Sequence, residues 1–366
     1  MPLDKLFEPL SFSHGPAMQN RFMLAPLTNQ QSYPDGRLSD EEFHWLTMRA
    51  TGGFGLTMTC AAHVQAVGQG FAGQLGIFGD QHIEGLTRLA ADIKAKGSIA
   101  AAQLHHAGNR SPKDLVGTPV CPSDDAKNGA RALTLGEVEQ LRDDFIAAAR
   151  RAEKAGFDGV EAHGAHGYIL AQFLSAETNR RTDRYGGSLE NRARIVFEII
   201  DGIRRVCRPD FQIGLRLSPE RFGLKLGEIR EVAAEVLRQG KIDYLDMSLW
   251  DFAKEPNEKE FQGRTLMSYF TDLPRGNVRL GAAGKVMAAS DAAAVLEAGC
   301  DYVLVGRAAI LRHDFPKRVR HDSAYQSPAL PVTEQHLRDE GLSPAFIKYM
   351  GNWPGFVAAK EVTAQA

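Results

Sequence analysis

The residues best suited to chemistry lie in one short cluster, Glu161-Ala-His163-Gly-Ala-His166-Gly-Tyr168. Two histidines three residues apart, each followed by glycine, are typical of a strand end that runs into a loop. Histidine N–H groups can bind and polarise one substrate oxygen, and a tyrosine hydroxyl can supply a proton. Taken alone, the segment leaves two alternatives open. The histidines could be ordinary hydrogen-bonded core or loop residues, or part of a Glu/His/His metal site that lacks an evident supporting shell.

Two glycine turns predict a phosphate site. Gly281-Ala-Ala-Gly284 follows one predicted strand, and Gly306-Arg307 follows the next. Glycine lets backbone N–H groups approach an anion, and arginine adds a charged, bidentate donor. A single glycine pair would be an ordinary tight turn. Two such turns after the last two strands of a barrel indicate a phosphate-bearing ligand.

Gln103 and Arg216 end two further predicted strands. An amide beside a guanidinium suits a planar heterocycle with carbonyl and ring-nitrogen acceptors. Polar lining of a barrel mouth is the alternative that the sequence leaves open.

These residues need a scaffold that brings strand ends together. Short apolar runs alternate with amphipathic segments, which predicts parallel strands separated by helices. Eight such units favour a closed (β/α)8 TIM barrel over an open sheet. We expect one domain over residues 1–366, with a core of about 20–320 and a C-terminal extension of about 322–366 that has no clear periodicity. The predicted strands are 21–26, 55–62, 98–105, 157–163, 211–218, 242–248, 278–282 and 301–306.

Composition limits the class of protein. Hydrophobic residues make up 43% and charged residues 24%, which excludes a disordered chain. A formal net charge of −2 argues against whole-chain binding to nucleic acid or anionic membrane. We expect no membrane span, because no apolar run approaches about 18 residues. The four cysteines are widely spaced, which predicts no disulfide framework, zinc knuckle or iron–sulfur cluster and favours a cytoplasmic location.

Four segments in fixed order resemble the Old Yellow Enzyme family of FMN-dependent ene-reductases. They are residues 20–28 (NRFMLAPLT), residues 103–108 (QLHHAG), the His163…His166…Tyr168 cluster and residues 181–192 (RTDRYGGSLENR). The terminal Val305-Gly-Arg307 adds to the resemblance, which covers about residues 3–320. The 181–192 segment is the most specific, because a chance match of that length is negligible.

The resemblance implies a barrel that binds FMN non-covalently and uses NAD(P)H to reduce the C=C bond of α,β-unsaturated carbonyl compounds by a ping-pong mechanism. It implies that His163 and His166 bind the carbonyl oxygen and that Tyr168 protonates Cα, with no metal. It also implies the cofactor-binding residues, which are Pro26, Leu27, Thr28, Ala61, Gln103, Arg216, Gly284, Gly306 and Arg307. Oligomeric state and the preference between NADH and NADPH stay open.

The chain departs from the family pattern at His105, Asn109, Asn29 and Gln30, which we expect near the pocket mouth. Tyr349 and Trp353 either cover the pocket of this or a neighbouring subunit or have a packing role. Two other functions remain alternatives: a cofactor-free barrel isomerase or lyase acting on a phosphorylated substrate, and a catalytically silent ligand-binding barrel. Both predict a colourless protein, whereas bound flavin absorbs visible light.

Overall fold

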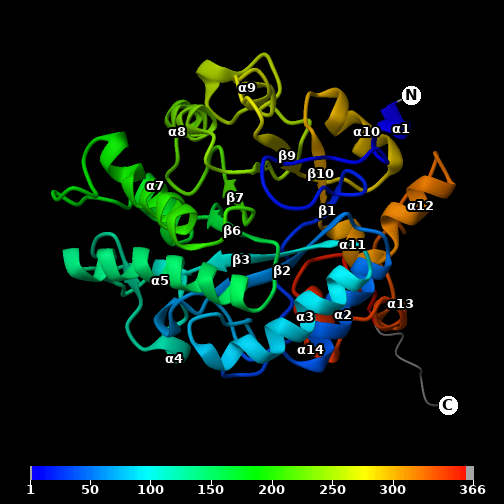
Figure 1. Ribbon diagram of the computed structural model, residues 1–366, viewed down its shortest axis with the longest axis horizontal. Coiled ribbons are helices and arrows are strands. Elements are labelled where there is room, and N and C mark those ends of the chain that lie inside the picture. The colour runs from blue at the N-terminus through cyan, green and yellow to red at the C-terminus, as the bar shows by residue number, and fades with distance from the viewer. Residues whose placement is uncertain (1, 360–366) are drawn as a thin grey trace.

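Strand pairing in the computed structural model, which describes residues 2–359, closes a ring of eight parallel strands (Figure 1). The first strand pairs with both the second and the last, so the sheet has no free edge. This confirms the predicted (β/α)8 TIM barrel. In chain order the barrel strands are β1 (Phe22–Leu24), β2 (Leu56–His63), β3 (Ile99–His105), β6 (Gly159–Gly164), β7 (Gln212–Leu217), β8 (Tyr244–Ser248), β9 (Arg279–Ala283) and β10 (Tyr302–Val305).

Helices surround the barrel and bury one apolar face each against the strands (Figure 1). In α5, Thr134 caps the N-terminus: its hydroxyl accepts from the Glu137 N–H at 3.2 Å, and the Glu137 carboxylate accepts from the Thr134 N–H at 2.8 Å. The main outer helices are α2 (Asp40–Thr51), α3 (Ile83–Ala95), α5 (Leu135–Lys154), α7 (Leu189–Val206), α8 (Leu226–Gln239), α10 (Ala289–Glu297) and α12 (Phe315–His321).

Shorter elements lie in the connections. Between β8 and β9, a long connection contains a 3-10 turn and one four-residue helix. A separate pair of two-residue strands lies between β3 and α5. These elements are α1 (Pro2–Lys5), α4 (Lys113–Val116), α6 (Ile169–Leu174), α9 (Ser268–Thr271), α11 (Arg307–Leu311), β4 (Val120–Cys121) and β5 (Arg131–Ala132).

The C-terminal extension folds back onto the barrel. It forms two helices that the sequence pattern does not predict, α13 (Glu334–Asp339) and α14 (Pro344–Gly351), which lie beside α2 in Figure 1. Phe346 stacks edge-on against Trp45 of α2, with ring centroids 5.4 Å apart. Short helices of this kind have too few turns to show a period, so tertiary packing decides them.

The barrel interior changes character along its axis. One cluster of buried apolar side chains, which includes Met23, Met58, Tyr244 and Tyr302, fills part of the interior. Alternate residues along a strand face the same side, and two positions further along β8 the buried side chain is Asp246. The strand register then sets buried polar residues side by side: Gln103 opposite Glu161, His163 opposite Arg216, and Arg216 opposite Asp246.

The assignment of all 366 residues to one domain stays a prediction. No helix within residues 2–359 is long and apolar enough to cross a membrane. The four cysteines are free thiols, and Cys60, Cys121 and Cys300 are buried.

Candidate active site

The twelve residues singled out from the sequence all line two adjoining cavities at the carboxyl ends of the strands. The cavities have volumes of about 280 and 500 Å³ and share part of their lining, including Leu27, Arg216 and Arg307. The structure therefore brings together segments almost 300 residues apart. The twelve are Pro26, Leu27, Thr28, Ala61, Gln103, His163, His166, Tyr168, Arg216, Gly284, Gly306 and Arg307.

The two histidines lie side by side. His163 Nε2 and His166 Nδ1 are 3.2 Å apart, and the other ring nitrogen of His166, Nε2, is 2.9 Å from Ser248 Oγ. Arg216 Nε donates to that same hydroxyl at 2.9 Å. An oxygen that accepts from both facing nitrogens would replace the bond between the rings. The facing nitrogens are close enough together to bind one ligand oxygen, and the oxygen-binding role stays a prediction.

Burial keeps both imidazoles neutral. It is the main reason that the pKa values of His163 and His166 lie well below the ordinary value, and nearby positive charges, including Arg216, lower them further. Burial also raises the pKa of Tyr168, against the opposing charge of Arg110. At neutral pH the site therefore holds neutral N–H donors beside a protonated phenol, the state needed for oxygen binding and proton donation.

Two buried carboxyl groups, those of Glu161 and Asp246, contact polar residues that line the cavity. Gln103 Nε2 donates to Glu161 Oε1 at 2.7 Å, which leaves the amide oxygen of Gln103 for a ligand. Arg216 Nε lies 2.9 Å from Asp246 Oδ2, and the terminal nitrogens of Arg216 make no hydrogen bond within the described chain. Burial raises the pKa of both Glu161 and Asp246, and the charge of Asp246 raises that of Glu161 further.

The glycine turns form the far end of the smaller cavity. A Cβ at Gly284 would lie 2.7 Å from the backbone nitrogen of Phe252, so only glycine fits there. Gly306 precedes α11, and Arg307 at the start of that helix lines both cavities. The guanidinium of Arg307 forms no hydrogen bond or ion pair with any residue in the 2–359 range. Close backbone and an unpaired guanidinium suit an anionic group such as phosphate.

Backbone strain is concentrated around these cavities. Six non-glycine residues within the described part of the chain have positive φ angles, and five of them line a cavity. Left-handed backbone costs such residues on the order of 1 kcal/mol or more, and it is often retained where side chains must face a ligand. The five are His166 (58°), Arg221 (70°), Phe222 (55°), Trp250 (69°) and Lys285 (54°).

The sequence alone missed several lining residues. Ser248, which bridges Arg216 and His166, is the last residue of β8, and its position at a strand end was the available signal. Arg221, Phe222 and Trp250 lie in loops and Arg110 ends a short 3-10 helix (Gly108–Arg110), and no sequence motif marked any of the four. The sequence left the role of Tyr349 and Trp353 open. The structure places both in the lining of the larger cavity of their own chain, together with Met350 and Phe356.

The four departures from the family pattern do not lie at the pocket mouth, and that expectation is wrong. His105 is buried under Tyr168, with ring centroids 4.3 Å apart, and accepts from Gln74 at 3.0 Å. Asn109 bonds Asp125 and Gln172, and Asn29 donates to Glu42 at 3.0 Å. None of these residues, nor Gln30, lines either cavity. The hydrogen bonds of His105, Asn109 and Asn29 direct these three side chains into the wall behind the site.

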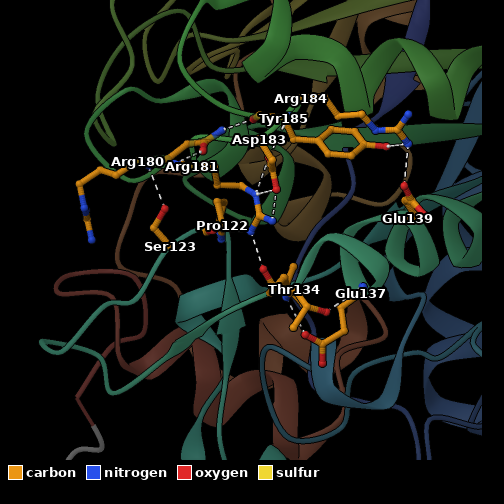
Figure 2. A network of polar contacts seen from close by, with 12 residues as sticks. Pro122, Ser123, Thr134, Glu137, Glu139, Arg180, Arg181, Asp183, Arg184 and Tyr185 are labelled. Carbon is orange, nitrogen blue, oxygen red and sulfur yellow. Dashed lines mark hydrogen bonds and ion pairs between the residues drawn. The ribbon is translucent and has the colours of Figure 1, made fainter.

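The 181–192 segment also lies away from the cavities. Figure 2 shows that it ties loops together: Arg181 donates to the Pro122 carbonyl at 2.8 Å and pairs with Asp183, whose carboxylate accepts from the Tyr185 N–H at 3.0 Å. Arg184 donates to Glu139 of α5 at 2.8 Å. The most specific sequence motif therefore has a structural role, because it connects loops through hydrogen bonds and ion pairs.

No group of three His, Cys, Asp or Glu side chains in the described part of the chain is arranged to hold a metal ion. Glu161 bonds Gln103, and His163 faces His166.

The residues present fit a flavin phosphate ester. A glycine turn without room for Cβ and an unpaired arginine lie at one end, and an amide oxygen and free guanidinium nitrogens lie along the cavity. A (β/α)8 barrel with this lining belongs to the class of flavin-dependent oxidoreductases.

Comparison with known proteins identifies the family. Residues 5–326 match the model of the NADH:flavin oxidoreductase / NADH oxidase family, and the chain belongs to this family. It is 38% identical over 327 residues to a probable NADH-dependent flavin oxidoreductase, YqiG, of Bacillus subtilis, covering 86% of this chain and 87% of that protein. An old yellow enzyme homologue from Zymomonas mobilis has a TM-score of 0.78 and 27% identity, covering 91% of this chain and 96% of that one. The resemblance to the Old Yellow Enzyme family is thus confirmed.

Some relatives are much longer. The chain is 32% identical over 333 residues to the NADH:fumarate oxidoreductase of Klebsiella pneumoniae. The match covers 86% of this chain but only 36% of that protein.

The protein is an NAD(P)H-dependent flavin oxidoreductase of this family, with FMN as cofactor and NAD(P)H as reductant.

Proposed function

We propose that the protein is an ene-reductase that reduces the C=C bond of α,β-unsaturated carbonyl compounds. The observation that carries this proposal is the facing pair His163 Nε2 and His166 Nδ1, 3.2 Å apart, with Tyr168 on the wall of the same cavity. This is the donor set that a carbonyl oxygen next to a reducible bond requires. When bound, FMN supplies the chemistry that transfers hydride from NAD(P)H to the acceptor.

We infer that the cofactor is held by the residues that line the smaller cavity and its junction with the larger one. Gly284, Gly306 and Arg307 would hold the phosphate, and Arg216 and Gln103 would bind the polar edge of the ring. The remaining contacts would come from Pro26, Leu27, Thr28 and Ala61.

The side chains around the acceptor would act on charge and on a proton. As hydride reaches Cβ, negative charge develops on the carbonyl oxygen, where two neutral N–H donors stabilise it by a few kcal/mol each. Tyr168, kept protonated by burial, would give its proton to Cα. One cavity would serve both NAD(P)H and the acceptor in turn, which gives ping-pong kinetics. A cytoplasmic location is proposed with it, consistent with the free thiols.

Two measurements test the proposal. The purified protein should show flavin absorbance, and NAD(P)H should bleach it in stopped flow. Addition of cyclohexenone to the reduced protein should then restore the absorbance and yield cyclohexanone. A colourless protein that isomerises or cleaves a phosphorylated substrate would contradict the proposal, as would a flavoprotein that oxygen reoxidises but no enone does.

A further inference from the structure

Two arginines alternate with three aromatic rings around the larger cavity. The guanidinium carbon of Arg110 lies 4.8 Å from the Tyr168 ring centre and 5.9 Å from that of Phe222. The guanidinium carbon of Arg221 lies 5.7 Å from the Phe222 ring centre and 5.2 Å from that of Trp250. All five side chains line the cavity that holds His163 and His166.

Neither arginine has a carboxylate partner within residues 2–359. The guanidinium of Arg110 donates to the backbone oxygen of His166, and the guanidinium of Arg221 has no hydrogen bond or ion pair among the described residues. Two acids next to this group of side chains are already engaged: Glu220, which precedes Arg221, pairs with Lys254, and Asp251, which follows Trp250, pairs with Lys285 at 2.8 Å. Two positive charges therefore lie uncompensated at the mouth of the pocket.

Stacking on the aromatic rings determines which N–H groups of each guanidinium remain available to a ligand. A guanidinium that lies over aromatic faces keeps its in-plane N–H groups available, and these match the two oxygens of a carboxylate or phosphate. Phe222 and Trp250 are 40% and 60% exposed, and they and Arg221 all have left-handed backbone. Exposed rings held in strained backbone indicate a surface kept for a ligand rather than for packing.

We propose that Arg110 and Arg221 bind an anionic group, a carboxylate or phosphate, on the ligand that occupies the pocket. The inference rests on the proposed function, because it places the anion on the same molecule whose oxygen the histidine pair would hold. The anion has two sources: a carboxylate on the reducible acceptor, or the diphosphate of NAD(P)H. Both sources would present the same anionic chemistry to the arginines. Measuring the reductive and the oxidative half-reactions separately distinguishes the two sources.

Binding is tested first without turnover. Isothermal titration calorimetry on the oxidised holoenzyme compares 3-(4-hydroxyphenyl)propanoate with its methyl ester, which share the phenol that the histidines would bind. We expect the carboxylate to bind about 10-fold more tightly than the ester at low salt, and added salt should reduce the difference. Arg221→Gln should abolish most of this difference in affinity. Arg221→Lys keeps the charge but loses the planar, stacked guanidinium, so it should retain only part of the difference.

The half-reactions then identify the source. Reductive stopped flow compares NADH with 1-benzyl-1,4-dihydronicotinamide, which carries no phosphate. A loss of NADH affinity in Arg221→Gln without loss for the benzyl compound assigns the site to the nucleotide. A loss confined to a carboxylate-bearing enone, compared with its methyl ester, assigns it to the acceptor. Arg264→Gln is the matched control, because Arg264 stacks 3.8 Å over Tyr269 and does not line the cavity.

The inference is overturned if acid and ester bind equally well and Arg221→Gln changes neither half-reaction selectively. Equal effects in Arg264→Gln would also overturn it, because net charge would then explain the result. The proposed function fails in a different way: neutral cyclohexenone would not reoxidise the reduced protein, while the calorimetric difference between acid and ester would still report on the arginines.

Discussion

Arginines occupy two regions of this molecule in opposite ways. In the 181–192 segment, Arg181, Arg184 and Arg192 each pair with a carboxylate, on Asp183, Glu139 and Glu228 respectively. Around the cavities, Arg110, Arg221 and Arg307 have no carboxylate partner among the described residues. The first region stabilises loops, and the second leaves charge available to a ligand. The segment most recognisable in sequence therefore lies outside the lining of the two cavities.

The largest expected effect comes from the cavity. Tyr168→Phe keeps the ring and its stacking on His105 but removes the proton, so reoxidation by cyclohexenone should slow by about 10²–10⁴-fold. Flavin reduction by NAD(P)H and reoxidation by oxygen should be largely spared, because neither needs protonation at Cα. Stopped flow at the flavin absorbance resolves the two halves. Equal slowing of both would assign Tyr168 a structural role.

Loss of either histidine of the facing pair, His163 or His166, should have the next largest effect. His163→Ala and His166→Ala should each slow enone reduction by about 10²–10³-fold and weaken phenol binding. His163→Asn and His166→Asn keep an N–H donor and should retain more activity. The unfolding temperature serves as the control, and a stoichiometric metal ion lost with either histidine would contradict the assignment.

The structural region should respond in the opposite manner. Arg181→Ala removes a partly buried ion pair and hydrogen bonds to two carbonyls, so the free energy of unfolding should fall by about 2–3 kcal/mol. Activity per folded, flavin-loaded molecule should stay unchanged. Denaturant unfolding and active-site titration measure the two quantities. A large loss of turnover with normal stability would break the contrast between the regions.

Arg307→Ala tests the phosphate end of the cavity. Loss of one charge-assisted contact, worth roughly 1.5–3 kcal/mol, should weaken FMN binding about 10–100-fold. Arg307 has no protein partner in the described chain, so stability of the apo-protein should not fall. Fluorescence titration of apo-protein with FMN measures the affinity, and an unchanged value would refute the assignment of Arg307.

The smallest effect concerns pH. Burial and the charge of Asp246 raise the pKa of Glu161 from its ordinary 4.5, so the folded state favours the protonated form. Its contribution to stability is therefore full below about pH 4.5 and is lost as pH rises through the folded pKa. Glu161→Gln should unfold with less pH dependence between pH 5 and 8 than the parent. Arg216, Asp246 and Gln103 surround this group, and identical pH profiles would show that they compensate for it.

Much of the fold and site is determined by local sequence. Strand and helix positions follow from apolar periodicity, as in α5, where the Thr134–Glu137 capping box marks the start. Because parallel strands in a barrel end at one face, placing His163, Arg216 and Gly306 at strand ends was enough to predict that they lie at the same end of the barrel, where they line two adjoining cavities. The C-terminal helices escaped this reasoning because their order comes from packing on α2.

Tertiary structure alone decided which polar groups meet and which remain unpaired. Nothing near Ser248 in sequence indicates that its hydroxyl joins Arg216 to His166, and no motif distinguishes the engaged Arg181 from the free Arg221. Likewise, His105 and Asn109 lie behind the pocket rather than at its mouth. The physical reason is that local periodicity reports which face of an element is buried, whereas hydrogen-bond and ion-pair partners depend on strand register and on loops that meet only after the barrel has closed.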